Sequence, residues 1–205
     1  VHAVEIDRSL EPHLRAALAP FPNAHLQIGD ALALPLADLD PPPGKLVANL
    51  PYSIGTPLCV ESLDGLPTVR RWCVMLQREV ADRFVAAPQT PAYGAVSVLV
   101  QLTAARMGMH PVARTCFRPP PNVDSALLAL ERTRDWGPEY PWLKRVVQGA
   151  FAHRRKTLAN SLALVGVTTR ARATEALRAL GCREAVRAEA LELIESWRQD
   201  AGTVE

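Results

Sequence analysis

The chain has 205 residues, of which 48% are hydrophobic and 21% are charged. These fractions are close to those of average globular proteins, which excludes a chain that is disordered throughout. The longest apolar runs, such as residues 95–100, are far shorter than the roughly 20 residues that a membrane-spanning helix needs. Basic residues number 23 and acidic residues 21, so the formal net charge of +2 does not by itself indicate a partner.

The distribution of charge is more informative than its total. Between Tyr140 and Ala173 there are seven lysines and arginines and no acidic residue. Such a block is typical of a surface that binds a polyanion, although many basic segments are only solvated.

The cysteines and histidines do not form a recognisable metal site. No C-x-x-C or H-E-x-x-H pattern occurs, which argues against a metal enzyme and against redox chemistry. We expect the cysteines to be small buried hydrophobic residues in a reducing compartment; they are Cys59, Cys73, Cys116 and Cys182.

The first part of the chain alternates between strand and helix patterns. Residues 1–6, 25–28, 45–48 and 72–76 are short apolar runs typical of buried strands, and residues 8–19 and 77–86 have helical periodicity. Another helical stretch separates the third and fourth strands. The alternation predicts an α/β sheet with parallel strands.

The second part changes character. Residues 93–105 are predicted to be helical, and residues 111–117 and 123–131 to be a pair of strands. Three consecutive prolines, residues 119–121, lie between them and must form a stiff connection, because proline cannot lie in a central strand. From Trp142 onward the pattern is helical. We therefore predict one domain over residues 1–134 and a smaller helical domain over residues 135–205.

Two acidic residues follow the first two predicted strands. Glu5 stands at the carboxyl end of the first, where a carboxylate can accept hydrogen bonds from both ribose hydroxyls of a nucleotide. Asp30 ends the second strand at the same edge of the sheet, where it could meet an adenine amino group. Each signal is weak alone, because acidic strand ends are more often only solvated.

The tetrapeptide Asn49-Leu50-Pro51-Tyr52 is a sharper signal. It follows an apolar strand directly, at the edge where open α/β sheets bind ligands. Methylation of an exocyclic amino group needs acceptors for the N–H groups, which an asparagine side chain and a neighbouring carbonyl can provide. Pro51 restricts the backbone, and Tyr52 offers a ring on which a base can stack. A polar turn with a half-buried tyrosine is the structural alternative.

Other motifs follow in order: Gln77-Arg78-Glu79-Val80, Tyr93-Gly94, F-R-P-P-P-N-V-D-S over residues 117–125 and R-R-K-T-L-A-N-S-L over residues 154–162. Together with the tetrapeptide, this set resembles the rRNA adenine N6,N6-dimethyltransferase family of the KsgA type, which modifies small-subunit (16S) ribosomal RNA. The resemblance covers nearly the whole chain, and its motifs are jointly very specific.

The resemblance implies a Rossmann-like fold that uses S-adenosylmethionine as cofactor. It implies that Asn49 and the Leu50 carbonyl, fixed by Pro51, orient the N6 amino group, and that Tyr52 and Phe117 hold the target adenine after it leaves its stack. It assigns cofactor binding to Glu5 at the ribose and Asp30 at the adenine, together with Ile6, Ala31 and Asn49.

The resemblance also implies the remaining partners. Arg154, Arg155 and Lys156 would bind RNA phosphates, which set register without reading sequence; a solvated helix face is the alternative. The expected partner is small-subunit rRNA or an immature small ribosomal subunit. We further expect a cytoplasmic monomer that needs neither a metal nor a membrane.

The chain departs from the family pattern in three places. Such a methyltransferase is expected to begin with a strand and a glycine-rich turn, whereas the first glycine here is Gly29, after the ribose acid. The sequence therefore opens at the expected second strand, and one wall of the cofactor pocket is predicted to be missing. Ala95 and Ala159 stand where related proteins often carry a basic residue.

Three rival interpretations stay open at this point. A related type of rRNA methyltransferase methylates an adenine of large-subunit rRNA and confers antibiotic resistance. The F-x-P-P-P and R-R-K-T motifs of this sequence favour the small-subunit type. A DNA adenine methyltransferase is disfavoured because Leu50 stands where that class usually has proline. A non-catalytic RNA-binding or ribosome-assembly factor is favoured by the missing glycine-rich turn and disfavoured by the intact tetrapeptide.

Overall fold

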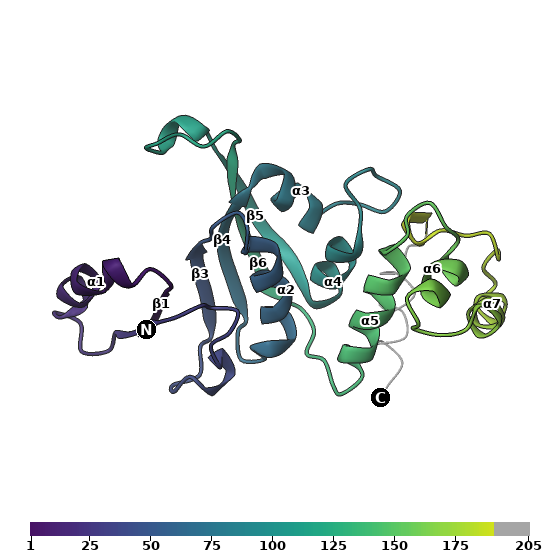
Figure 1. Cartoon of the computed structure of the whole chain (residues 1–205), viewed down its shortest axis with the longest axis horizontal. Coiled ribbons are helices and arrows are strands. Elements are labelled where there is room, and N and C mark those ends of the chain that lie inside the picture. The colour runs from purple at the N-terminus through teal and green to yellow at the C-terminus, as the bar shows by residue number, and fades with distance from the viewer. Residues whose placement is uncertain (191–205) are drawn as a thin grey trace.

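The computed structural model describes residues 1–190 of the chain and contains two separate β-sheets (Figure 1). In the first, β1 (His2–Glu5) pairs in parallel with β2 (His25–Ile28). A 3₁₀ turn (Arg8–Leu10) and the helix α1 (Glu11–Leu18) connect these strands, and Asp7 caps the turn by accepting from the Ser9 N–H. The β-α-β pattern predicted for this region is confirmed.

The second sheet has four strands in the order β3-β4-β6-β5. Its strands are β3 (Lys45–Asn49), β4 (Arg71–Gln77), β5 (Ala104–Val112) and β6 (Ser125–Arg132). β3 and β4 run parallel, but β6 is antiparallel to both of its neighbours. The parallel pairing predicted for the first part of the chain is confirmed for β1–β2 and β3–β4, whereas β5 and β6, predicted only to be a pair of strands, are antiparallel. Only a 3₁₀ turn (Arg114–Cys116) lies between them, whereas a parallel pair needs a long crossover.

The predicted limits of β5 are wrong. A strand over residues 111–117 and a helix up to residue 105 were expected, but α4 (Ala95–Thr103) ends earlier and β5 begins at Ala104. Because β5 is the edge strand of its sheet, Pro111 can belong to it without breaking an interior ladder.

Helices α2 (Gly55–Gly65), α3 (Arg78–Phe84) and α4 lie against one face of the four-stranded sheet (Figure 1). Alternate residues of β4 enter the core on this side: Trp72, Val74 and Leu76 are almost fully buried. This is the period-2 pattern of a strand with one covered face. Near the carboxyl end of β3, where the tetrapeptide begins, Ala48 packs against the same core.

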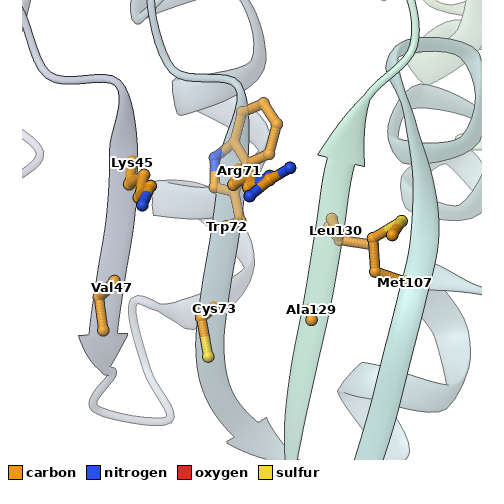
Figure 2. Close-up of a pocket in the computed structure, with 8 residues that line it drawn as sticks. All are labelled: Lys45, Val47, Arg71, Trp72, Cys73, Met107, Ala129 and Leu130. Carbon is orange, nitrogen blue, oxygen red and sulfur yellow. The ribbon is translucent and has the colours of Figure 1, made fainter.

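The opposite face of the same sheet is open. Val47 is 75% exposed and Met107 63% exposed, and a shallow hollow of about 350 Å³ lies on the sheet here (Figure 2). None of the tetrapeptide residues takes part in it. It is lined by Lys45, Val47, Arg71, Trp72, Cys73, Met107, Ala129 and Leu130.

The region before the tetrapeptide contributes little to the core. No residue from 1 to 49 is buried, and the buried core begins at Leu50. Among the described strands, β1 is hydrogen-bonded only to β2 and β3 only to β4. Among the described residues, each therefore has an unpaired edge.

The helical part consists of α5 (Tyr140–Phe151), α6 (Leu158–Leu164) and α7 (Arg170–Ala179), followed by a 3₁₀ turn (Ala188–Ala190). The first half of α5 packs on the core of the sheet, and its end packs on a second core formed by α6 and α7. Lys144 on α5 links the parts further. Its Nζ lies 2.9 Å from Glu61 Oε2 and 3.3 Å from Asp64 Oδ1 on α2.

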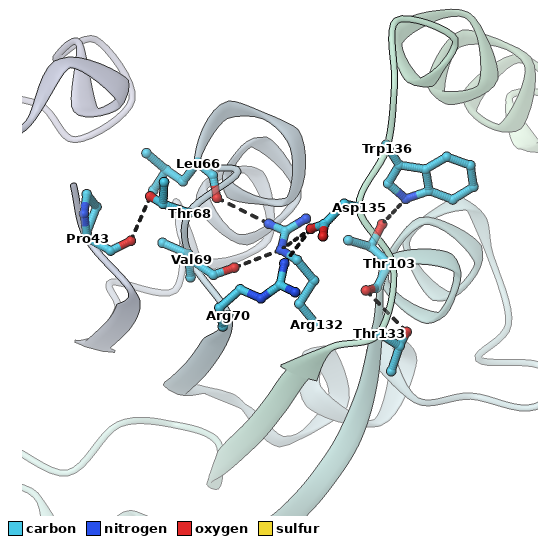
Figure 3. A network of polar contacts seen from close by, with 10 residues as sticks. All are labelled: Pro43, Leu66, Thr68, Val69, Arg70, Thr103, Arg132, Thr133, Asp135 and Trp136. Carbon is cyan, nitrogen blue, oxygen red and sulfur yellow. Dashed lines mark hydrogen bonds and ion pairs between the residues drawn. The ribbon is translucent and has the colours of Figure 1, made fainter.

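A buried arginine holds the end of β6 against the α2–β4 connection (Figure 3). The Arg132 guanidinium donates to the carbonyls of Val69 and Leu66 at 2.7 and 3.2 Å, and lies over the ring of Trp72. Burial lowers the pKa of Arg132, but an arginine retains its charge, so two carbonyls and an aromatic face are suitable partners. Asp135, paired with Arg70, lies at the rim of this network.

Only one of the four thiols fulfils the expectation of burial. Cys59 on α2 is buried, but Cys73 and Cys116 are exposed, and Cys182 is half-buried. Cys73 lies on the open face of the sheet (Figure 2). Cys116 precedes Phe117 in the loop between β5 and β6, so neither thiol enters a core.

We predict that iodoacetamide at pH 8 modifies Cys73 and Cys116 in the folded protein but not Cys59. Burial raises the pKa of the Cys59 thiol from 9.0 to about 12, and the thiolate is the reactive form. Peptide mapping by mass spectrometry, with a urea-unfolded sample as control, measures each site. Equal labelling of Cys59 and Cys116 would contradict the placement of Cys59.

The raised pKa of Cys59 also lowers the free energy of unfolding as the pH rises above 9, because the unfolded chain then loses a proton that the folded chain keeps.

In the described part of the chain no helix is long and apolar enough to cross a membrane.

Candidate active site

The tetrapeptide lies where β3 gives way to α2. Asn49 is the last residue of β3, and the Leu50 N–H continues the ladder by donating to the Met75 carbonyl at 3.3 Å. Leu50 is buried and anchors the segment. The Pro51 carbonyl then accepts the N–H groups of Ile54 and Gly55, which begins the turn into α2. The backbone is thus held on both sides of the proposed acceptors.

Two oxygen acceptors stay available in this segment. The Asn49 side chain is at an exposed position, and within the described part of the chain its amide makes no hydrogen bond. The Leu50 carbonyl likewise accepts no hydrogen bond from the described residues. An exocyclic amino group has two N–H donors, so these two acceptors match it in number.

Tyr52 is tied to a motif 73 residues further along the chain. Its hydroxyl lies 2.7 Å from the hydroxyl of Ser125, the first residue of β6. Ser125 is buried, whereas Tyr52 is 37% exposed. The structure therefore joins the tetrapeptide to the F-x-P-P-P-x-V-D-S motif.

Phe117 is half-buried in the loop between β5 and β6. Asp124 closes this loop, because its Oδ1 accepts the Arg114 N–H at 2.9 Å. The Asp124 carbonyl in turn accepts the Arg78 N–H at 2.9 Å, at the start of α3. The loop that carries Phe117 is thus attached to the Gln77–Val80 motif as well as to its own strands.

Glu5 and Asp30 lie at the carboxyl ends of neighbouring parallel strands. Glu5 is the last residue of β1, its carbonyl accepts the Gly29 N–H at 2.8 Å, and Asp30 follows at once. Each carboxylate accepts one backbone N–H two residues on, from Asp7 and Leu32. Among the described residues neither carboxylate forms an ion pair.

Ile6 and Ala31 follow these acids at the same edge. Ile6 is 64% exposed, and Ala31 is half-buried against the main core. Because β1 and β3 are not neighbours in a sheet, no backbone ladder joins this edge to the tetrapeptide. The structure thus forms two groups of predicted site residues, one at each sheet.

The predicted RNA-binding residues lie in the turn between α5 and α6 rather than on a helix face. Arg155 and Lys156 are exposed and have no ion-pair partner in the described region. Arg154 differs, because its guanidinium is within 3.5 Å of the carbonyls of Pro91 and Tyr93 and 3.4 Å from Glu189. Arg154 therefore holds the turn against the loop that contains the Tyr93-Gly94 motif.

Three polar residues of the site were not singled out from the sequence. Ser125 and Asp124 connect the loops described above, and the Ser161 hydroxyl fixes the basic turn by donating to the Gly149 carbonyl at 2.7 Å and accepting from the His153 N–H at 3.2 Å. All three stand inside motifs that were recognised. Their roles depend on contacts with distant residues, which spacing along the chain does not reveal.

Comparisons with known proteins identify the family of the chain. The family model described as ribosomal RNA adenine dimethylase matches residues 1–195. A protein of Rubrobacter xylanophilus named ribosomal RNA small subunit methyltransferase A is 44% identical over 191 residues, which are 93% of this chain and 72% of the relative. The protein of the same name from Lactococcus lactis is 40% identical over 171 residues, 79% of this chain and 58% of its own length.

Solved structures share the fold. A dimethyladenosine transferase from Plasmodium falciparum has a TM-score of 0.73 at 20% identity, covering 97% of this chain and 79% of that one. The 23S rRNA methyltransferase ErmE has a TM-score of 0.57 at 27% identity, covering 93% and 78%. The first likeness supports a Rossmann-like methyltransferase fold and nothing finer. With a family model that matches almost the whole sequence and relatives at 40–44% identity, the chain belongs to the ribosomal RNA adenine dimethylase family.

Proposed function

We propose that this chain carries the active site for dimethylation of adenine N6 in small-subunit (16S) ribosomal RNA, with S-adenosylmethionine as the methyl donor. The observation that carries the proposal is the junction of the tetrapeptide and the Phe117 loop, made by the bond between Tyr52 and Ser125. It joins the segment that carries the free amino-group acceptors and Tyr52 to the first residue of β6, the strand that follows the Phe117 loop. The names and 40–44% identities of the bacterial relatives favour small-subunit rRNA over the large-subunit alternative.

The residues present fit the cofactor in chemistry. Glu5 and Asp30 end adjacent parallel strands, the position from which an acid can accept from ribose hydroxyls or an adenine amino group. Each carboxylate uses one oxygen for its own turn and has further lone pairs for a ligand. Ile6 and Ala31 would supply apolar contacts beside them. When bound, S-adenosylmethionine supplies a methyl group on a positively charged sulfur.

The chain's own residues would orient the acceptor nitrogen. Before the first transfer, the Asn49 side-chain oxygen and the Leu50 carbonyl would each accept one N6–H, which directs the nitrogen lone pair away from them and toward the methyl group. Each transfer replaces one N–H by a methyl group and releases one proton, so one N–H is left to orient the nitrogen before the second transfer. Since Leu50 is anchored on both sides, little ordering is needed when the base enters. Rate enhancement would come chiefly from this positioning.

Tyr52 and Phe117 would hold the target adenine outside its stack. Both rings are only partly buried and so have surface available to a base. Base–aromatic stacking is worth about 1–3 kcal/mol per base, which offsets part of the cost of extruding the nucleotide.

The helical part, from about residue 135, would bind RNA through its basic residues. Arg155 and Lys156 are the best placed of the predicted three, and Arg170 and Arg172 at the start of α7 are also exposed. A monomer that acts in the cytoplasm on an immature small subunit is the simplest form of this proposal.

We expect the double substitution Arg155→Ala and Lys156→Ala to weaken RNA binding and to reduce its salt dependence. Each phosphate contact contributes about one unit to the slope of log affinity against log salt, so a decrease of about two units is expected. Fluorescence anisotropy with a labelled rRNA fragment at several salt concentrations measures the slope.

Arg8→Ala with Arg15→Ala is the matched control for this measurement. It removes the same charge from exposed positions near α1, far along the chain from the basic turn. An equal decrease in slope for both double variants would indicate only a general charge effect, and an unchanged slope for Arg155→Ala/Lys156→Ala would make the turn a solvated surface.

A methyl-transfer assay tests the proposed function. The full chain is incubated with S-adenosylmethionine carrying a labelled methyl group and with small ribosomal subunits that lack the modification. Mass spectrometry of the digested RNA should detect N6,N6-dimethyladenosine in 16S rRNA. Modification of large-subunit rRNA, or of no adenine, would contradict the proposal.

A non-catalytic RNA-binding role is the second candidate. It would use the exposed basic residues of the turn between α5 and α6, Arg155 and Lys156, and would need no cofactor. Calorimetric titration of the chain with S-adenosylmethionine separates the two. Micromolar binding supports the enzyme, whereas RNA binding without cofactor binding supports the second role.

A further inference from the structure

Ser125 is a buried side chain with a partner in the tetrapeptide. Only 1% of the residue is exposed, and its hydroxyl lies 2.7 Å from that of Tyr52. In the sheet Ser125 is placed opposite Gln77 at the end of the ladder between β4 and β6. Because both neighbouring strands hold this position, the hydroxyl is a fixed point to which the exposed ring of Tyr52 is attached.

Asp124 holds the loop that carries the other aromatic residue of the proposed site, Phe117. Its carboxylate accepts the Arg114 N–H and closes the base of the loop that carries Phe117. Its carbonyl accepts the Arg78 N–H, which joins that base to the end of β4. Two adjacent residues, Asp124 and Ser125, therefore hold the two loops that bear Phe117 and Tyr52.

A free tyrosine on an exposed loop samples several rotamers, and fixing one to receive a base costs binding free energy. A hydrogen bond at the far end of the ring restricts its direction before the base arrives. Among the described residues, the Tyr52 hydroxyl has no other hydrogen-bond partner, so this restriction depends on Ser125.

We infer that Asp124 and Ser125 are positioning residues that set the placement of the two aromatic faces between which the target adenine is held. The inference rests on the proposed function, since it concerns capture of the same base. It predicts a role for the Tyr52 hydroxyl that stacking alone does not require, because phenylalanine would stack equally well.

The first test follows the ring itself and does not depend on methyl transfer. The chain has three tyrosines, and the other two, Tyr93 and Tyr140, are almost fully buried. Tyrosine labelled with ¹³C in the ring gives an NMR signal for Tyr52 that Tyr52→Phe identifies. Ser125→Ala should shift this signal and increase its mobility while leaving the other two in place. An unchanged Tyr52 signal would overturn the inference.

The second test measures base capture with an RNA oligonucleotide that carries 2-aminopurine at the target position, together with KM and kcat for the unlabelled RNA. Ser125→Ala should weaken capture and raise KM about 5–10-fold, the usual effect of one lost hydrogen bond. Tyr52→Phe should have a similar effect, and the double variant should be no worse than either single variant. Additive losses would overturn the inference.

Ser62→Ala is the matched control. Ser62 is a similarly buried serine, and its hydroxyl donates to the Cys59 carbonyl and accepts from the Trp72 indole. It should lower the melting temperature without weakening capture. Equal effects of Ser62→Ala and Ser125→Ala on capture would reduce Ser125 to a structural residue. If the unsubstituted chain neither captures nor methylates adenine, the proposed function fails. The NMR test examines the hydrogen bond between Tyr52 and Ser125 alone, so its result does not depend on that outcome.

Discussion

Asn49→Ala should lower methyl transfer by about 10²–10³-fold while RNA affinity changes little. Losses of this size are typical when one preorganised hydrogen-bonding group at the reacting centre is removed. Asn49 is at an exposed position at the end of β3, and its side chain makes no hydrogen bond to the described residues, so the fold does not depend on it. Single-turnover methylation of the RNA and anisotropy of RNA binding measure the two quantities separately.

Asn23→Ala is the matched control, since Asn23 is an exposed asparagine between α1 and β2. It should leave both quantities unchanged. A parallel loss of methyl transfer and RNA affinity in Asn49→Ala would mean that Asn49 is structural and that the acceptor of the amino group lies elsewhere.

Phe117→Ala should reduce methyl transfer by roughly 5–150-fold, and Phe117→Tyr should reduce it far less. The range follows from the 1–3 kcal/mol of a base–aromatic stack, which tyrosine retains and alanine loses. The fluorescence of an RNA with 2-aminopurine at the target position reports the same stacking without the cofactor.

Phe21→Ala serves as the control for a lost phenylalanine, because Phe21 is 57% exposed and lies in the first sheet's connection. It should have no effect on either readout. If Phe117→Tyr were more harmful than Phe117→Ala, stacking would be the wrong explanation for Phe117.

The family followed from the sequence, because it is carried by short contiguous motifs. The proposed roles of Asn49 to Tyr52 also come from residue types within one short segment, which can be recognised without coordinates. The positions of β1, β2, β3 and β4 could also be predicted, since each is a short apolar run bounded by a turn or a helix.

What the sequence did not predict concerns partners that are distant in the chain. The sequence indicated that β5 and β6 form a pair but not their direction, which depends on how the sheet closes and is not encoded in local periodicity. The burial of Cys59 but not of Cys73 follows from helices covering only one face of the sheet. Arg154 looks like Arg155 in the sequence, yet it contacts a loop some 60 residues away.

Ser125 and Asp124 illustrate the same difference between what the sequence predicts and what only the folded structure shows. Both stand in a motif that identifies the family, but nothing in the motif indicates that one serine hydroxyl meets Tyr52 across 73 residues. Side-chain chemistry is local and can be read from the residue types, and the proposed function of this site was derived from it. The orientation of side chains is set by packing between segments far apart in the chain, and only the folded structure showed that Ser125 meets Tyr52 and that Asp124 closes the loop of Phe117.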